Sequence, residues 1–214
     1  MEAPGRQVAR AVAGPLLGAV LVLGVPAPVG VDAHPGLDRF LVAPPPDLLD
    51  GDVVFRRGVD AIGRIVLSQS EQSRFSHVGM VVRAGARTLV AHALPETSRQ
   101  DGGVRLEALE SFGSPAHAAD IGYYRPRQMS EKQRAEVRQY LLASVGTPFD
   151  MRFEYSTDGS VYCTELVLKA LARVGIDLTR SLDTVHVLML EEPAFAPDSL
   201  WRADALQALE STER

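Results

Sequence analysis

The sequence has 214 residues, of which 46% are hydrophobic and 23% are charged, and its formal net charge is −5 at pH 7. This apolar fraction excludes a disordered chain, and the length is sufficient for one globular domain with a core. A mildly acidic chain without a long basic run is not expected to bind nucleic acid through its phosphates. The single cysteine excludes both an internal disulfide and a metal site built from several thiolates.

Residues 1–33 are predicted to be an export signal. Arg6 and Arg10 form a short basic start, and the uncharged residues that follow include several glycines and prolines. Cleavage is expected after Ala33, which leaves residues 34–214 as one domain in the periplasm or outside the cell. An uncleaved membrane anchor is the alternative, because an uncharged run of 21 residues is just long enough to span a bilayer.

The rest of the chain predicts an α+β domain. Five short runs rich in β-forming residues predict strands at 52–56, 77–82, 89–94, 104–109 and 121–125. The second and third runs flank a short turn and therefore predict a β-hairpin. A short helix is expected at about 59–69, between the first two strands.

Two longer helices are predicted in the second half of the chain. Ser130 and Gln133 form a capping-box pattern, and Gly146 is a suitable helix stop. The stronger signal begins at Cys163, because apolar residues recur after it at the spacing of one helical face until Gly175. The C-terminal segment reads as a loop, followed by a short amphipathic helix at about 199–210.

Cys163 occupies the first turn of its predicted helix. Unpaired backbone N–H groups and the helix dipole favour a negative charge there. Both effects are expected to lower the pKa of the thiol, whose deprotonated form is the nucleophile. Its helical phase directs the side chain toward the sheet. The alternative interpretation is a small buried hydrophobic residue, which is the usual role of a free cysteine.

A cysteine nucleophile needs an imidazole that takes its proton and returns it to the leaving group. His77 and His92 lie on the predicted hairpin, whereas the other histidines fall in predicted loops and are expected to be solvated: His34, His117 and His186. A turn centred on Gly85 and Ala86 places His92 opposite Gly79, and the two hairpin histidines then share a face as diagonal neighbours. A three-residue turn would put them on opposite faces.

Several segments, in this order, resemble the circularly permuted NlpC-like papain-fold hydrolases, the YiiX/YebB-like group. They are GDVVFR at 51–56, FSHVGMVV at 75–82, VAHA at 90–93, GTPFD at 146–150 and YCTELV at 162–167. The histidine strand combined with the later cysteine helix is the most specific part. The resemblance covers about residues 48–195. It implies a permuted papain-like fold, in which an antiparallel sheet packs against a helix that carries the cysteine nucleophile.

The resemblance also implies roles for individual residues. Cys163 is the nucleophile, His77 is the general base and acid, and His92 orients the His77 ring by accepting a hydrogen bond from it while neutral. The Cys163 backbone N–H is a natural donor to the oxyanion. Two roles remain open for Asp52, which either contacts substrate or begins a strand. Two remain open for Tyr162, which either lines the pocket or packs in the core.

Together these features predict an exported thiol hydrolase that cleaves an amide or ester bond through an acyl-enzyme, with Cys163 attacking as a thiolate paired with His77. The resembling family includes cell-wall amidases and peptidases as well as lipid-directed thioesterases and acyltransferases. The substrate therefore stays open among a cell-wall peptide, an N-acyl amino acid and a lipid ester. A partner in the cell envelope is compatible with each of them, and the sequence does not predict an oligomeric state.

Two other functions are compatible with the same residues. Cys163, His77 and His92 offer one thiolate and two imidazoles, which is a ligand set for an open zinc site. A non-catalytic binding module on the same fold is the second alternative. No phosphate-binding loop, nucleotide fingerprint or serine elbow is found in the sequence, so no nucleotide or organic cofactor is expected.

Overall fold

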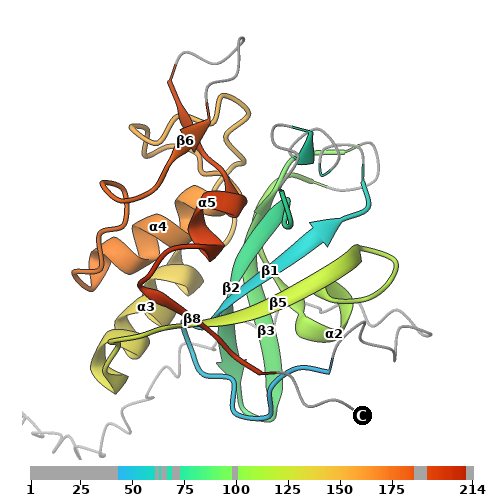
Figure 1. Cartoon of the computed structure of the whole chain (residues 1–214), viewed down its shortest axis with the longest axis vertical. Coiled ribbons are helices and arrows are strands. Elements are labelled where there is room, and N and C mark those ends of the chain that lie inside the picture. Colours follow the sequence, from blue (N-terminus) through green and yellow to red (C-terminus); the bar gives the residue numbers. More distant parts are fainter. Residues whose placement is uncertain are drawn as a thin grey trace, which may run out of the picture. The chain divides into compact units, whose positions relative to one another are not determined.

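The computed structural model describes residues 43–60, 63, 67–68, 73–97, 101–185 and 192–210. Their main element is an antiparallel six-stranded sheet with the strand order β4-β3-β2-β1-β5-β8 (Figure 1). Its strands are β1 Val53–Gly58, β2 His77–Ala84, β3 Arg87–Leu94, β4 Gly103–Ala108, β5 Ala118–Pro126 and β8 Leu206–Ala208. All five predicted strands are confirmed, whereas the helix predicted at about 59–69 lies largely outside the described residues.

The helices lie on both faces of this sheet. In the described part of the chain they are α2 Leu109–Phe112, α3 Glu131–Ala143, α4 Cys163–Arg173 and α5 Pro197–Trp201. Figure 1 shows α3, α4 and α5 on one side of the sheet and α2 on the other. A separate two-stranded sheet joins β6 Thr184–Val185 to β7 Ala194–Phe195. Among the described residues, no helix is long and apolar enough to cross a membrane.

Alternating side chains along the strands contribute to two separate cores. The larger core lies between the sheet and α4, with Val78 and Met80 of β2 packed together with Leu166 and Leu171 of the helix. The smaller core lies on the opposite face, where apolar strand residues pack with α2: Val54, Val81, Val90, Leu109 and Phe112. The sheet is therefore buried on both faces, which explains why its central strands read as continuous apolar runs.

The two strongly predicted helices are confirmed, and so is the capping box of α3. Ser130 N–H donates to Gln133 Oε1 at 2.9 Å, and Gln133 N–H donates to Ser130 Oγ at 3.3 Å. At the start of α4, Tyr162 N–H donates to Glu165 Oε2 at 3.0 Å. This bond satisfies one of the amides that a helix N-terminus leaves without a partner.

The helix predicted at about 199–210 is wrong for most of its length. The described helix α5 begins at Pro197 and ends at Trp201, and Leu206–Ala208 instead form β8, which pairs with β5. Leu206 is buried in the larger core. Without β8, β5 would be an edge strand with unpaired N–H and C=O groups, so strand pairing with β5 replaces the helical pattern.

Candidate active site

The hairpin of β2 and β3 has the predicted register near its turn but opens at its other end. Pairing runs from Ala84 and Arg87 as far as Met80 and Ala91, although both strands continue. Beyond that point β2 remains paired with β1, and β3 remains paired with β4. The ladder pairing of the two strands therefore ends before residues 77–79 and 92–94, although Gly79 and His92 remain in close contact, and we call this unpaired stretch the β2–β3 opening.

Cys163 lies at the β2–β3 opening. Val81 N–H donates to Asp52 O at 2.8 Å on the β1 side. Because N–H directions alternate along a strand, Val78 N–H points to the opposite side, where the ladder with β3 has ended. The amides of Val78, Thr164 and Cys163 itself interact with Cys163 Sγ. The opening thus gives the sulfur a set of backbone donors.

His77 and His92 form a buried pair beside this opening. His77 Nε2 lies 2.9 Å from His92 Nδ1, and the ring planes meet at 75°. The predicted diagonal relationship on one face of the hairpin is thereby confirmed. A Cβ on Gly79 would lie 3.0 Å from the His92 Cβ, so the glycine leaves the space that the imidazole needs.

The histidine pair does not lie on the face that α4 covers. The ring centroids of His77 and His92 lie 5.8 Å and 5.2 Å from that of Phe112 in α2. Cys163 belongs to the larger core on the other face. The helical phase directs Cys163 at the sheet, as predicted, but the two histidine rings lie on the opposite face of that sheet. Among the described residues, no hydrogen bond joins Cys163 Sγ to either ring.

Glu107 of β4 extends the histidine pair into a line of polar groups, and the sequence analysis missed it. Its Oε2 lies 3.0 Å from His92 Nε2, although the two groups are not aligned well enough to meet hydrogen-bond geometry. Ser111 Oγ donates to Glu107 Oε1, and Arg56 Nη1 lies 3.9 Å from Oε2. No pattern in the sequence points to Glu107. The residue reaches this place through the β3–β4 register, which pairs it with Val90, two residues before His92.

Burial and local charge determine the ionisation of this line. Burial raises the pKa of Glu107, but His92, Ser111 and Arg56 outweigh this effect and lower it to about 2. Burial lowers the pKa of His92 to about 4, although the Glu107 carboxylate acts in the opposite direction. Burial and the charge of Arg56 hold the pKa of His77 well below its usual value of 6.5. At neutral pH the line therefore consists of a carboxylate and two neutral rings.

The thiol of Cys163 is also neutral in this structure. Burial raises the pKa of Cys163, and the Thr164 side chain and the surrounding amides lower it by less. The helix N-terminus was expected to lower this pKa and to create a thiolate–imidazolium pair with His77. That expectation is wrong for the resting state, because desolvation of the thiolate exceeds the effect of the helix N-terminus.

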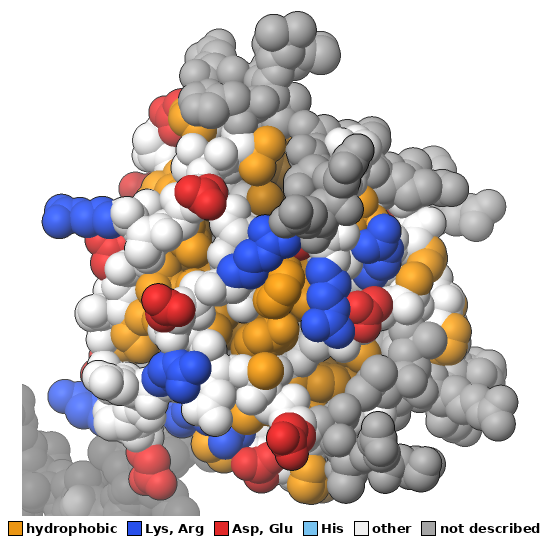
Figure 2. Space-filling view, in the orientation of Figure 1, with side chains coloured by type: hydrophobic (Ala, Val, Ile, Leu, Met, Phe, Trp, Pro, Cys, Tyr) orange, Lys and Arg blue, Asp and Glu red, His pale blue; other side chains and the backbone are white. Residues whose placement is uncertain are grey.

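Both rings of the histidine pair are buried. On the face drawn in Figure 2, apolar side chains gather near the centre among Lys and Arg side chains. His77 is 9% exposed and His92 is 0% exposed. His117 is exposed, as predicted. His34 and His186 lie outside the described residues.

Asp52 immediately precedes β1, four residues before Arg56. Arg56 is the residue of β1 that pairs with His77. The Asp52 carboxylate accepts hydrogen bonds from Arg125 Nη2 at 2.7 Å and Arg134 Nη1 at 3.2 Å. It also accepts one from the backbone N–H of Leu49 at 2.9 Å. These contacts correspond to the strand-start role of Asp52, and the structure does not bring the residue to the histidine pair.

Tyr162 precedes Cys163 in sequence, but its side chain turns into the core. The residue is 1% exposed, and its hydroxyl accepts a hydrogen bond from Phe195 N–H at 3.1 Å. Burial raises the pKa of the phenol. These contacts correspond to the core-packing role, and they leave the hydroxyl engaged with the backbone of β7.

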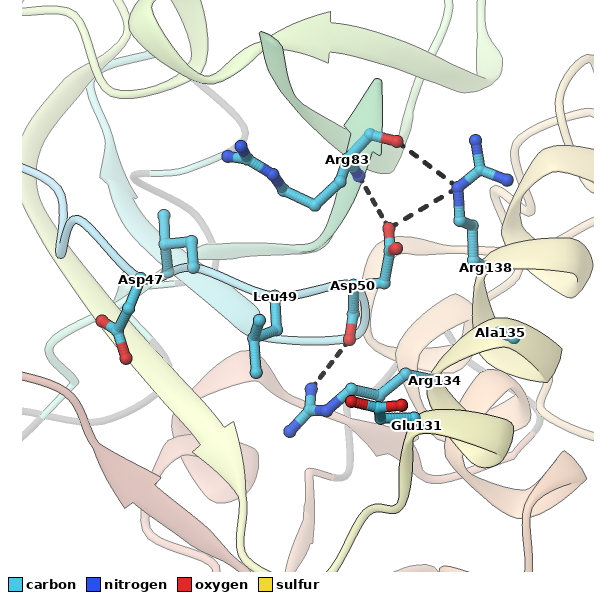
Figure 3. Close-up of a pocket in the computed structure, with 9 residues that line it drawn as sticks. Asp47, Leu49, Asp50, Arg83, Glu131, Arg134, Ala135 and Arg138 are labelled. Atoms are coloured by element: carbon cyan, nitrogen blue, oxygen red, sulfur yellow. Dashed lines mark hydrogen bonds and ion pairs between the residues drawn. The ribbon is translucent and has the colours of Figure 1, made fainter. Parts of the chain in front are cut away.

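A cavity of about 480 Å³ lies near the turn end of β2, away from the histidine pair (Figure 3). Figure 3 shows Arg83 and Arg138 on either side of Asp50, with Arg134 reaching the Asp50 backbone oxygen. Arg83 N–H donates to Asp50 Oδ1 at 2.7 Å, and Arg134 Nη1 donates to Asp50 O at 2.8 Å. Asp50 is thus held by both Arg83 and Arg134, and none of the residues that line this cavity belongs to the polar line.

A metal centre was considered for the same residues. Within the described part of the chain, no group of three or more His, Cys, Asp or Glu side chains is placed to hold a metal ion. His77 and His92 direct one ring nitrogen each at the other. The donor set of Cys163, His77 and His92 therefore does not fit a zinc site in this conformation.

Comparisons with known proteins agree with the fold. A family model described as permuted papain-like amidase enzyme, YaeF/YiiX, C92 family, matches residues 47–210. The structure is similar to the crystal structure of the metalloprotein yiiX from Escherichia coli O157:H7, with a TM-score of 0.61 and 21% identity over 77% of this chain and 98% of that chain. A comparison with curated proteins gives no match. The chain therefore belongs to the permuted papain-like amidase family and is a cysteine hydrolase of permuted papain-like fold.

Proposed function

We propose that this cysteine hydrolase cleaves an amide or ester bond through an acyl-enzyme on Cys163, with His77 as the proton carrier. The observation that carries the proposal is the buried contact of 2.9 Å between His77 Nε2 and His92 Nδ1, next to an opening that holds the only thiol. A neutral His92 that accepts from His77 Nε2–H leaves a lone pair on His77 Nδ1. That nitrogen is the base of the proposed reaction.

The first half of the reaction forms the acyl-enzyme. Cys163 Sγ attacks the substrate carbonyl carbon while its proton moves to His77 Nδ1, and the carbonyl oxygen takes the negative charge. The first-turn amides of α4, at Cys163 and Thr164, are suited to bind that oxygen. The tetrahedral intermediate then expels an amine or alcohol, which takes the proton from His77.

The second half releases the product. Water attacks the thioester and gives one proton to His77 Nδ1, the carbon–sulfur bond breaks, and the thiolate recovers that proton. The products are a carboxylic acid and the free thiol. An amine or alcohol in place of water would give acyl transfer by the same steps.

The general ester p-nitrophenyl acetate tests this proposal. Wild-type protein is expected to release p-nitrophenol and to carry an acetyl group on Cys163 by intact and peptide mass spectrometry. Cys163→Ala and His77→Ala are expected to lose both signals, whereas His117→Ala, at an exposed histidine outside the polar line, is expected to retain them. Unchanged turnover by folded Cys163→Ala would overturn the proposal, and a wild-type protein that forms no adduct would favour the binding module.

Zinc chemistry requires a separate measurement, because the yiiX crystal structure is described as that of a metalloprotein. We expect the described side chains to act without a metal at Cys163. Metal analysis of protein purified without chelator, combined with alkylation of Cys163, tests this. Stoichiometric zinc that protects Cys163 from alkylation would overturn the thiol mechanism.

We also propose that the protein is exported and that its substrate belongs to the cell envelope. The basic start and the uncharged run of residues 1–33 support export, and 34–214 then form the mature domain. A cell-wall peptide, an N-acyl amino acid and a lipid ester are the candidate substrates. N-terminal sequencing of protein with a C-terminal tag is expected to begin at His34. A membrane-bound product that begins at Met1 would instead indicate an anchor.

A further inference from the structure

We propose that Glu107 is a positioning residue that determines which ring nitrogens of His92 and His77 carry protons. This inference rests on the proposed function, in which His77 acts as the base. It concerns a residue that touches neither thiol nor substrate in the proposed reaction and acts through His92. Two contacts connect Glu107 to His77, the residue that carries the proton. Glu107 Oε2 lies 3.0 Å from His92 Nε2, and His92 Nδ1 lies 2.9 Å from His77 Nε2.

The close approach of the Glu107 carboxylate to His92 Nε2, at 3.0 Å, favours one direction of hydrogen bonding along this line even though the contact does not meet full hydrogen-bond geometry. An ionised carboxylate can only accept, so the facing nitrogen of His92, Nε2, is the one that carries the proton. The neutral His92 ring then has its lone pair on Nδ1, and His77 must donate from Nε2. The remaining lone pair lies on His77 Nδ1, which is the nitrogen that can accept the thiol proton.

The opposite direction would disable the base. A proton on His92 Nδ1 would make His92 the donor to His77 Nε2, and the neutral His77 ring would then carry its own proton on Nδ1. That nitrogen could no longer accept a proton from Cys163. Because both rings are buried, water is not an alternative partner. Glu107, at the end of the polar line, therefore decides which of the two protonation patterns the rings adopt.

The surroundings of Glu107 hold its carboxylate ionised and in place. Ser111 Oγ donates to Oε1, and the Arg56 guanidinium lies near Oε2. Arg56 is itself fixed, because it is 4% exposed, donates to Phe112 O at 3.3 Å and lies 4.5 Å from the Phe112 ring centroid. Arg105 adds a second positive charge that acts on both rings and on the carboxylate. The Glu107 side chain is only 16% exposed.

Nitrogen-15 NMR of the histidine rings tests the inference directly. In wild-type protein at neutral pH, two-bond correlations are expected to show the Nε2–H form for His77 and His92. Glu107→Gln keeps the size of the side chain, but its amide N–H can donate to His92 Nε2 and stabilise the reversed pattern. We expect Nδ1–H forms in this variant and a fall in kcat for p-nitrophenyl acetate of about 100-fold or more, the loss that removal of a general base causes, with little change in KM.

Two further variants separate positioning from structure. Glu107→Asp keeps the carboxylate, so it is expected to retain the Nε2–H forms and to recover part of the lost kcat. Glu110→Gln changes an exposed carboxylate on α2 and is the matched control, expected to behave as wild type. If Glu107→Gln does not fold, Nδ1–H forms on His77 in wild-type protein or in Glu107→Asp would still overturn the inference.

The outcomes are distinguishable from those that test the proposed function. Nδ1–H on His77 in wild-type protein, or Nε2–H with full kcat in Glu107→Gln, would overturn the role of Glu107 while Cys163→Ala remained inactive. Full activity in Cys163→Ala would overturn the proposed function itself, whatever form the histidine rings take.

Discussion

Gly79 faces His92 so closely that a Cβ on the glycine would lie 2.7 Å from Ala91 O and 3.0 Å from the His92 Cβ. We therefore predict that Gly79→Ala destabilises the protein by about 1–3 kcal/mol, the usual effect of overpacking, and displaces the His92 ring. Urea unfolding and p-nitrophenyl acetate turnover measure the two effects. Gly159→Ala is the control, because a Cβ there meets no atom within 4 Å. Wild-type stability and turnover in Gly79→Ala would contradict the prediction.

The neutral thiol predicts an alkylation profile that rises toward alkaline pH. Because burial raises the pKa of Cys163, the rate constant for iodoacetamide is expected to increase with a midpoint above the value of about 8.5 for a free thiol. Intact mass spectrometry over a pH series measures this, with the urea-unfolded protein as the reference for an exposed thiol. Alkylation that stays fast below pH 6 would instead indicate a preformed thiolate–imidazolium pair.

Glu165 predicts a pH dependence of stability. Burial raises its pKa from 4.5 to about 7, although Lys169, at 2.9 Å, opposes the rise. The folded protein thus binds the proton more tightly than the unfolded chain does, so stability falls as pH increases from 4.5 to 7. The full effect is at most about 3 kcal/mol.

Glu165→Gln is expected to flatten this part of the stability curve while its amide oxygen still accepts from Tyr162 N–H. Urea unfolding at several pH values measures the change. Glu136→Gln, at an exposed position on α3, is the control and should keep the wild-type slope. An identical slope in Glu165→Gln and wild type would show that Glu165 does not cause the pH dependence.

Asp198 ties α5 to the segment that leads into His77. Its Oδ1 accepts hydrogen bonds from Arg74 N at 2.7 Å and from Trp201 Nε1 at 2.9 Å. Asp198→Ala leaves these donors unsatisfied, so we expect a loss of about 1–3 kcal/mol in unfolding free energy. Trp201 is the single tryptophan, and its fluorescence should report the released contact. Asp204→Ala, at an exposed position, should leave both signals unchanged, and the same result for Asp198→Ala would contradict the prediction.

The sequence predicted the features that depend on local spacing. The register of the histidine hairpin followed from a count across the turn at Gly85 and Ala86, because side chains alternate strictly along strands. The helix from Cys163 followed from its apolar spacing and its terminal glycine. Both features are stabilised by neighbours that lie close in the chain, so no knowledge of the tertiary fold was needed.

Other features depend on tertiary packing and could not be predicted. Glu107 reaches His92 only through the register of β3 with β4, and a single glutamate in a strand carries no signal of that contact. The pKa of Cys163 depends on how deeply α4 is buried, which helical phase does not specify. Leu206 lies in β8 instead of a helix because the edge of β5 is available to it.

The β2–β3 opening has a consequence for observing the reaction. Val78 N–H acts on Cys163 Sγ and lowers the pKa of the thiol, so its electronic environment depends on what the sulfur carries. A thioester sulfur is a poorer acceptor than the thiol or thiolate that it replaces. Formation of an acyl group should therefore shift the Val78 amide resonance and speed its exchange with deuterium. A single backbone amide would then report whether Cys163 carries an acyl group.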